Sequence, residues 1–412
     1  MTTQEAILDL NRLLWGRGRM PTAGVEIVYP GGYDERGGYF TGAEFVLDGV
    51  RCRGTVFFSQ PGYAGDCPPE TVLHVVSAAS PQLHTPHGAE VPQVVAMPGL
   101  ADVDLYARVR TGGGAGGESP CAAWIRDLDE VKRLDLFTRL YDDRAQRKYA
   151  EVLALLDEGR QDWNYVLYML FFRAMGGSDL KEQYASVARR VPYHAVAHEK
   201  GEPRRIEAML LGASGLLDRR EDDSYTVELK RDFDYLSRKY GISPMAYTAW
   251  RSDHLVNYAP PVLRLVQIAG FLVAREFIFD KIMACRTPKD LYSVFRAEIS
   301  DYWLAQFQPS RSGVSPGALG RGKIELLGIN LVVPLMYAYA VHTADDTLRE
   351  AAIDQLDALE PESNRKTSAW RRQGVVMRSA HDSQAILELH NEYCVPGRCY
   401  RCRVGNQTLK NL

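Results

Sequence analysis

The hydrophobic pattern changes period along this chain, and this change limits the possible folds more than any other feature. Between residues 24 and 97, short β-rich runs such as residues 25–29 alternate with Gly, Pro and Ser, as is typical of strands and turns. Asp48-Gly49 separates two such runs, and this dipeptide favours a two-residue hairpin turn. From Trp124 onward, apolar residues recur at helical spacing. The sequence therefore predicts an α+β protein, with a small α/β module followed by a large all-α domain.

A glycine-rich run at residues 112–117 marks the expected boundary between these parts. A phosphate-binding loop would end in Gly-Lys-Ser or Gly-Lys-Thr at a helix start, whereas Glu118-Ser119-Pro120 follows here. We therefore interpret the run as a flexible linker. The predicted domains are an α/β module at residues 1–110, the linker at 111–123, an all-α domain at 124–385 and a Cys-rich C-terminal turn at 386–412.

Composition excludes several classes of protein. Apolar residues make up 46% and charged residues 25% of the chain, which excludes a disordered protein. Lys and Arg total 49 against 52 Asp and Glu, whereas a protein that wraps nucleic acid along its whole length is usually strongly basic. Any contact with DNA or RNA is therefore expected at a local basic face. The chain starts without a basic segment and a long apolar core, and its seven cysteines are an odd number, so we expect reduced thiols and a cytoplasmic location.

One apolar run, residues 324–341, raises the question of a membrane. It carries Glu325 and Asn330, and Pro334 interrupts it, while a spanning helix needs about 20 predominantly apolar residues. We interpret it as a buried core helix kinked at Pro334. No membrane partner is expected.

The strongest chemical signal is a cluster of soft ligands near the C-terminus. Its four candidate metal ligands are His390, Cys394, Cys399 and Cys402. They can close a tetrahedral Zn²⁺ site, since a predicted helix places the first two on one face and the last two have Cys-x-x-Cys spacing. An iron–sulfur cluster is the alternative, with a fourth thiolate from Cys52, Cys67 or Cys285. Three reduced thiols without a metal are the third interpretation.

Basic residues gather in three places. Residues 365–412 hold nine Lys or Arg against three acids. A loop with Arg311, Arg321 and Lys323 precedes a predicted helix, where backbone N–H groups and these side chains can hold a phosphate. Arg189-Arg190 and Arg204-Arg205 form the third patch. The alternative for each is an ordinary solvated face.

Three acids on the N-terminal strands are weak catalytic candidates, namely Glu26, Asp34 and Glu44. Metal-dependent cleavage of a phosphodiester needs several carboxylates on adjacent strands and a nearby base. The strand at residues 50–58 offers Phe57 and Phe58 where an acid and a base would be needed. Surface carboxylates on a sheet are the alternative, and His74 is expected to be a hydrogen-bonded core histidine.

Several stretches together resemble an uncharacterised bacterial family, the domain of unknown function 2851. They are residues 25–31, 48–49, 72–76, 206–217, 261–264, 300–303, 330–334, 381–384 and 391–405. The resemblance implies an N-terminal half similar to the PD-(D/E)XK nuclease fold, with one acid on a strand and Glu-x-His on the next. These positions fall on Tyr39 and on Phe57-Phe58-Ser59, so that only Glu26 survives.

The loss of two ligands leaves too little negative charge to hold a divalent cation, so bound Mg²⁺ is not expected. The chain is similar to a catalytically degenerate nuclease that binds DNA or RNA without cleaving it. Two alternatives remain, namely an active metal-dependent phosphodiesterase that uses a rearranged set of carboxylates, and a structural or scaffolding protein. The sequence gives no oligomeric state and no pathway.

Overall fold

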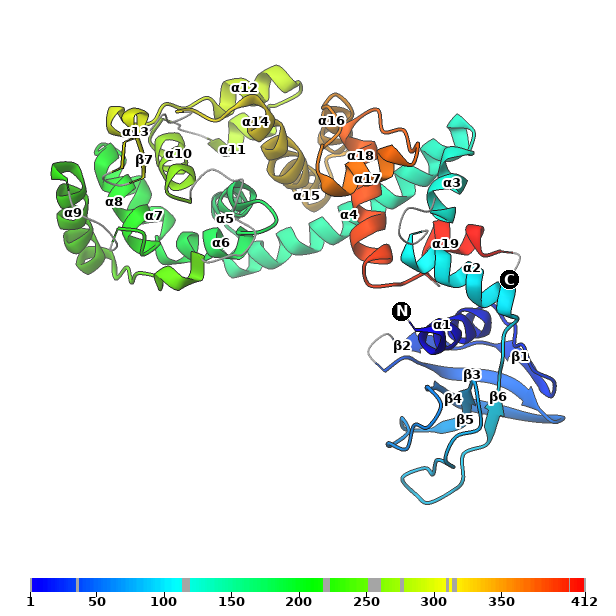
Figure 1. The fold of residues 1–412 in the computed structure, drawn as a ribbon. Coiled ribbons are helices and arrows are strands. Elements are labelled where there is room, and N and C mark those ends of the chain that lie inside the picture. The colour runs from blue at the N-terminus through cyan, green and yellow to red at the C-terminus, as the bar shows by residue number, and fades with distance from the viewer. Residues whose placement is uncertain are drawn as a thin grey trace. The chain divides into compact units, whose positions relative to one another are not determined.

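The structure is a computed structural model that describes residues 2–34, 37–112, 119–217, 223–250, 261–274, 278–308, 311–312, 317–399 and 401–410. The chain forms two compact units. Unit 1 comprises residues 1–137, 363–376 and 386–412, and unit 2 comprises residues 138–362 and 377–385. Strands gather in unit 1 and helices dominate unit 2 (Figure 1), which confirms the α+β class. Residues 113–118 of the predicted linker lie outside the described residues, and the predicted range 111–123 also includes the start of a helix at Pro120.

Unit 1 contains a mixed sheet. Its strands are β1 (Val25–Tyr29), β2 (Gly32–Asp34), β3 (Tyr39–Leu47), β4 (Val50–Phe58), β5 (Thr71–Val76) and β6 (Gln93–Val95). The order is β1-β3-β4-β5-β6, with β2 also pairing with β3. Pairs up to β4 are antiparallel, whereas β5 and β6 run parallel to β4. Asp48 and Gly49 have φ of 47° and 84°, and Leu47 pairs with Val50, so the predicted hairpin turn is confirmed.

One helix, α1 (Thr3–Gly16), packs its apolar side on the sheet. Thr2 and Glu5 form a capping box at its start, which satisfies backbone N–H groups that the first turn leaves without partners. The Trp15 ring meets Phe45 at 5.5 Å and Phe58 at 6.0 Å between centroids, both edge to face. This aromatic group is the centre of the unit 1 core.

The rest of unit 1 is helical and joins segments far apart in sequence. Its complete helices are α2 (Leu100–Thr111), α3 (Pro120–Arg126), α17 (Arg365–Arg372), the π-helix η4 (Leu389–Cys394) and α19 (Arg403–Thr408). Helix α19 packs on α3, and the Thr408 hydroxyl lies 3.8 Å from the Cys121 sulfur across 287 residues of sequence. The C-terminal residues 386–412 therefore belong to the same unit as the N-terminal sheet.

Helices make up nearly all of the described part of unit 2. They are α5 (Trp163–Gly176), α6 (Lys181–Arg190), α7 (Tyr193–Glu199), α8 (Pro203–Ala213), α9 (Ser224–Tyr240), η1 (Tyr247–Trp250), α10 (Pro261–Ala274), α11 (Ile278–Met283), α12 (Pro288–Phe295), α13 (Asp301–Ala305), α14 (Arg321–Leu327), η3 (Gly328–Val332), α15 (Val333–Thr343) and α16 (Asp346–Asp357). A short ribbon joins β7 (Gln306–Gln308) and β8 (Arg311–Ser312). Helices α4 (Glu130–Glu158) and α18 (Ala380–Glu388) each contribute to both units.

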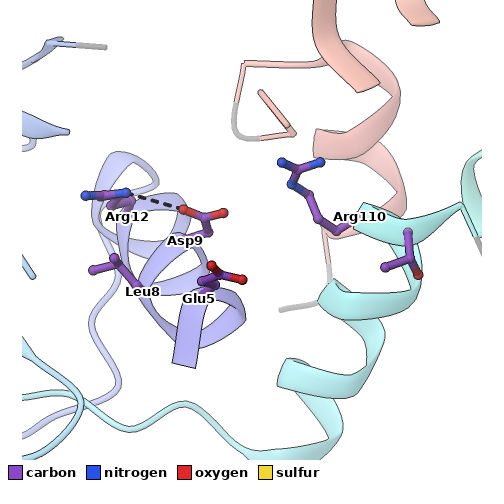
Figure 2. A pocket seen from close by; sticks show the side chains of 6 residues that line it. Glu5, Leu8, Asp9, Arg12 and Arg110 are labelled. Atoms are coloured by element: carbon purple, nitrogen blue, oxygen red, sulfur yellow. Dashed lines mark hydrogen bonds and ion pairs between the residues drawn. The ribbon is translucent and has the colours of Figure 1, made fainter. Parts of the chain in front are cut away.

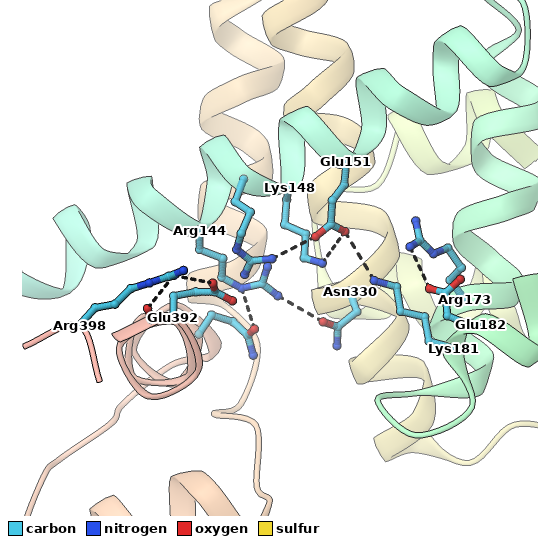
Figure 3. Close-up of polar contacts among 11 residues, drawn as sticks. Arg144, Lys148, Glu151, Arg173, Lys181, Glu182, Asn330, Glu392 and Arg398 are labelled. Carbon is cyan, nitrogen blue, oxygen red and sulfur yellow. Dashed lines mark hydrogen bonds and ion pairs between the residues drawn. The ribbon is translucent and has the colours of Figure 1, made fainter. Parts of the chain in front are cut away.

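Charged groups on α4 bond within unit 2 (Figure 3). The Arg144 guanidinium donates to Gln384 at 2.8 Å and to Asn330 at 3.2 Å. Glu151 accepts from Lys148 at 2.9 Å. Arg144 is buried, and a buried charge is tolerated only where such partners replace water. Its two bonds therefore hold α4 to α18 and η3, whereas the pair of Lys148 and Glu151 lies within α4 itself.

The apolar run around Pro334 consists of three helical pieces, since the π-helix η3 separates α14 from α15. Pro334 lies in the first turn of α15 and supplies no backbone N–H. Among the described residues, this is the one helical stretch that is long and apolar enough to span a membrane, and 67% of its apolar window is buried inside the protein. Such burial is typical of a core helix, as predicted, and the break takes the form of a π-turn.

Candidate functional site

The three candidate acids of the sheet have different surroundings. Glu26 is exposed on β1 and pairs in register with Val46. Glu44 on β3 binds Arg51 at 3.0 Å and Arg53 at 3.6 Å. The Asp34 carboxylate accepts the Gly37 N–H at 2.7 Å and so stabilises the turn after β2. In this part of the structure, Glu44 and Asp34 already have partners that a metal ion would need to displace.

The two positions that would carry nuclease acids face each other, because Tyr39 pairs directly with Phe57 across β3 and β4. Phe57 stacks on the His74 ring at 5.6 Å and packs with Leu83 and Val91. The Ser59 hydroxyl lies 2.8 Å from His74 Nε2. His74 is fully buried and burial lowers its pKa, which confirms the predicted hydrogen-bonded core histidine. Apolar side chains fill the place of the acids.

The predicted phosphate ligands precede and begin α14. Arg311 lies in β8, and its side chain is outside the described part. Arg321 donates to Glu325 at 3.0 Å and lies over the Tyr292 ring. The Lys323 ammonium donates to two carbonyls at the C-terminus of α5, at 2.8 and 3.1 Å. Arg321 and Lys323 therefore act as structural groups here, and no local sequence signal indicates that Lys323 turns inward.

Acids bind three of the four arginines in the third basic patch, whereas Arg190 donates to Ser186. Arg189 binds Glu158 through two nitrogens at 2.8 and 3.1 Å. Arg205 binds Glu199 at 2.7 Å, and this carboxylate is only 4% exposed. Desolvation raises the pKa of Glu199, but hydrogen bonds from Lys239, Tyr240 and Arg205 outweigh it and lower the pKa to about 2. These ion pairs stabilise unit 2 and reduce the positive charge that the patch presents to a phosphate.

A different set of cations lines a groove of unit 1 with a volume of about 550 Å³. Its five cations are Arg12, Arg17, Arg19, Arg401 and Lys410. Tyr33 and Phe40, whose ring centroids lie 4.8 Å apart, also line it. None of its described lining residues is Asp or Glu. We call this the basic groove.

The basic groove joins the end of α1 to the C-terminal tail. Arg17 donates to the backbone carbonyls of Leu409 at 2.6 Å and Asn406 at 2.9 Å. Carbonyl partners orient a guanidinium without cancelling its charge. The basic tail was expected from the sequence, whereas the three arginines at residues 12, 17 and 19 were not, although their close spacing is visible in the sequence.

A neighbouring hollow of unit 1 has mixed charge (Figure 2). Its charged residues are Glu5, Asp9, Arg12 and Arg110. Asp9 binds Arg12 at 3.3 Å, and desolvation raises the pKa of this carboxyl despite the nearby guanidinium groups. Asp9 thus offsets the charge of Arg12, and no ion pair of Asp9 with another cation of the basic groove is found among the described residues.

Four cysteines line a separate cavity of about 240 Å³ in unit 1. They are Cys121, Cys394, Cys399 and Cys402. His390 also lines it, together with apolar side chains such as Trp370 and Leu389. We call this the cysteine cavity. It brings together the four residues predicted as metal ligands and adds Cys121, which the sequence analysis missed.

The candidate fourth thiolates Cys52, Cys67 and Cys285 do not line the cysteine cavity. Cys285 belongs to unit 2, and the described thiols are all free. Burial raises the pKa of Cys121 to about 12 and that of Cys399 to about 11. Reactive and redox-active thiols have lowered pKa values. The raised pKa values of these thiols therefore do not indicate a catalytic cysteine.

Two features shape the wall of the cysteine cavity. Cys394 ends η4, and π-turns are frequent at functional sites. Arg110 donates to the Cys394 carbonyl at 3.3 Å. Its guanidinium lies against Gly397, which has a φ of 78°, and occupies the place that a Cβ atom would take there. Within the described residues, no three His, Cys, Asp or Glu side chains are arranged to hold one metal ion.

Comparison with known proteins places this chain in a family. The model of the family described as "Protein of unknown function (DUF2851)" matches residues 69–365, more than half of the chain. The chain belongs to this family. The matched range includes Cys121 but leaves out β1 to β4, the basic groove and the three C-terminal cysteines. The comparisons with curated proteins and with solved structures find no match.

Proposed function

We propose that this member of the DUF2851 family binds the phosphate backbone of a nucleic acid in the basic groove and does not cleave it. The basic groove carries the proposal, because five cations and no described acid line one concavity. Phosphate contacts from Arg and Lys supply most of the affinity in non-specific nucleic-acid binding. Aromatic side chains beside such cations provide stacking surfaces for unpaired bases. The partly exposed Tyr33 occupies that place, and Phe40, which is only 4% exposed, supports its ring from the core.

The sheet supports the part of the proposal that excludes cleavage. A PD-(D/E)XK-like site would need acids at Tyr39 and Phe57, and the pairing of these two residues across β3 and β4 leaves an apolar surface there. Glu26 alone supplies too little charge for a divalent cation. The proposed role is therefore that of an inactive nuclease-like module that retains its hold on nucleic acid.

The test uses the full chain and a labelled 20-nucleotide single-stranded DNA, with duplex DNA and RNA of the same sequence as parallel probes. We expect binding that weakens steeply between 50 and 200 mM salt, and intact probe after incubation with Mg²⁺ or Mn²⁺. Cleavage that is lost in Glu26→Ala would overturn the inactive assignment and support the rearranged carboxylate set. Failure to bind any probe at 50 mM salt would support a scaffolding role instead.

A further inference from the structure

The cysteine cavity has the composition of a cofactor site rather than of a core. Cys121 comes from the first turn of α3, Cys394 from the end of η4, and Cys399 and Cys402 from the turn before α19. The segments are far apart in sequence, yet all four cysteines line one cavity of about 240 Å³. Free buried cysteines are usually scattered as small apolar residues. Four around one void need a specific explanation.

We propose that Cys121, Cys394, Cys399 and Cys402 ligate an iron–sulfur cluster that fills this cavity and fastens the C-terminal tail to α3. The spacing of the last three is Cys-x4-Cys-x2-Cys, which is also the spacing of three cluster ligands in plant-type ferredoxins. Cys121 supplies the fourth thiolate from a distant segment.

The arrangement of the thiols favours a cluster over a single ion. A tetrahedral zinc ion holds each sulfur at about 2.3 Å, so its four ligands must converge on one point. No three described side chains of suitable type converge in this way. In a cluster the thiolates bind different iron atoms, and they surround a volume instead of a point. Cysteines that line a cavity but do not converge on one point fit the geometry of a cluster.

The surroundings match the charge of such a cofactor. A cluster with four thiolates carries net negative charge, and hydrogen bonds to its sulfurs stabilise it. The Gly405 N–H donates to the Cys402 sulfur at 3.3 Å, and the Thr408 hydroxyl lies 3.8 Å from the Cys121 sulfur. Arg110, which donates to the Cys394 carbonyl, adds a positive charge to the cavity wall.

His390 is the competing fourth ligand, because it lines the same cavity. A site of three cysteines and His390 is the usual composition of structural zinc. Cys121 would then have no role in metal binding. The two assignments therefore differ in metal, in sulfide content and in the effect of a single substitution.

The experiment measures iron, acid-labile sulfide and zinc in the full chain, purified without oxygen and again after reconstitution with ferrous iron and sulfide. We expect iron and sulfide in equal amounts, with zinc below one tenth of the iron. Cys121→Ser should lose at least four fifths of the iron. Cys285→Ser, a matched change of a buried thiol outside the cavity, should keep the wild-type content, and so should His390→Ala.

Stoichiometric zinc without sulfide would overturn the proposal, as would wild-type iron content in Cys121→Ser. If Cys121→Ser does not fold, pulsed EPR of the reduced wild-type protein still decides. Absence of nitrogen hyperfine coupling from a histidine ligand is expected, and its presence would overturn ligation by four cysteines. The proposal does not depend on nucleic-acid binding, since every measurement is made on the protein alone.

Discussion

The role of Lys323 as a buried helix cap predicts an unusual pH dependence of stability. Desolvation, with Arg264 nearby, lowers the pKa of this lysine from 10.5 to about 7. Between these two values the unfolded chain holds a proton that the folded chain has released, so stability increases with pH by about 1.4 kcal/mol per unit. Because the folded lysine is still half protonated at pH 7, the increase from pH 7 to pH 9 is smaller than two full units, about 2 kcal/mol. This corresponds to roughly 4–8 °C in the midpoint of unfolding for a domain of this size.

Replacement of Lys323 by methionine removes the titrating group and keeps its length. Thermal unfolding followed by circular dichroism at pH 7, 8 and 9 should show the increase in wild type and a much smaller one in Lys323→Met. Lys148, whose pKa desolvation lowers to about 8, contributes equally to both proteins and cancels in the difference. Lys281→Met, a change of an exposed lysine, is the control. Equal pH dependence in wild type and Lys323→Met would refute the reasoning.

Two further predictions concern unit 1. Gly397→Leu should displace Arg110 from the cysteine cavity and lower the iron content at least twofold. Gly62→Leu, at a similar φ of 83° with open space around it, should keep the wild-type iron content. Equal iron loss in both variants would mean that backbone strain alone causes the loss. Phe57→Ala should lower the free energy of unfolding by about 3–5 kcal/mol because it empties a packed site, as measured by urea denaturation, while Glu26→Ala on the exposed side of β1 should change it by about 0.5 kcal/mol or less.

Local chemistry allowed the sheet to be predicted. The run at residues 25–29 and the turn at Asp48-Gly49 depend on side-chain alternation and on two positive φ angles, which neighbouring residues determine. Strand β2 has only three residues, which are too few to show an alternation pattern, and its pairing with β3 holds it in the sheet. The α+β class was therefore accessible from the sequence.

The candidate sites were less accessible, because distant segments form them. No local pattern distinguishes Cys121 from the other isolated cysteines, since the packing of α19 on α3 brings it to the tail. The inward direction of Lys323 depends on the position of the α5 C-terminus. Arg17 and Arg401 likewise meet only because the tail folds back on α1.

The basic groove as a phosphate-binding surface is the central claim, and the salt dependence of binding tests it most directly. Each phosphate contact with single-stranded DNA contributes about −0.7 to the slope of log affinity against log salt. Arg401→Ala with Lys410→Ala should therefore make the slope shallower by about 1.4 and weaken binding at 100 mM salt. Arg108→Ala with Lys132→Ala removes two charges from exposed ion pairs of unit 1 and should leave both quantities near wild type. Equal changes in the two double variants would contradict the account.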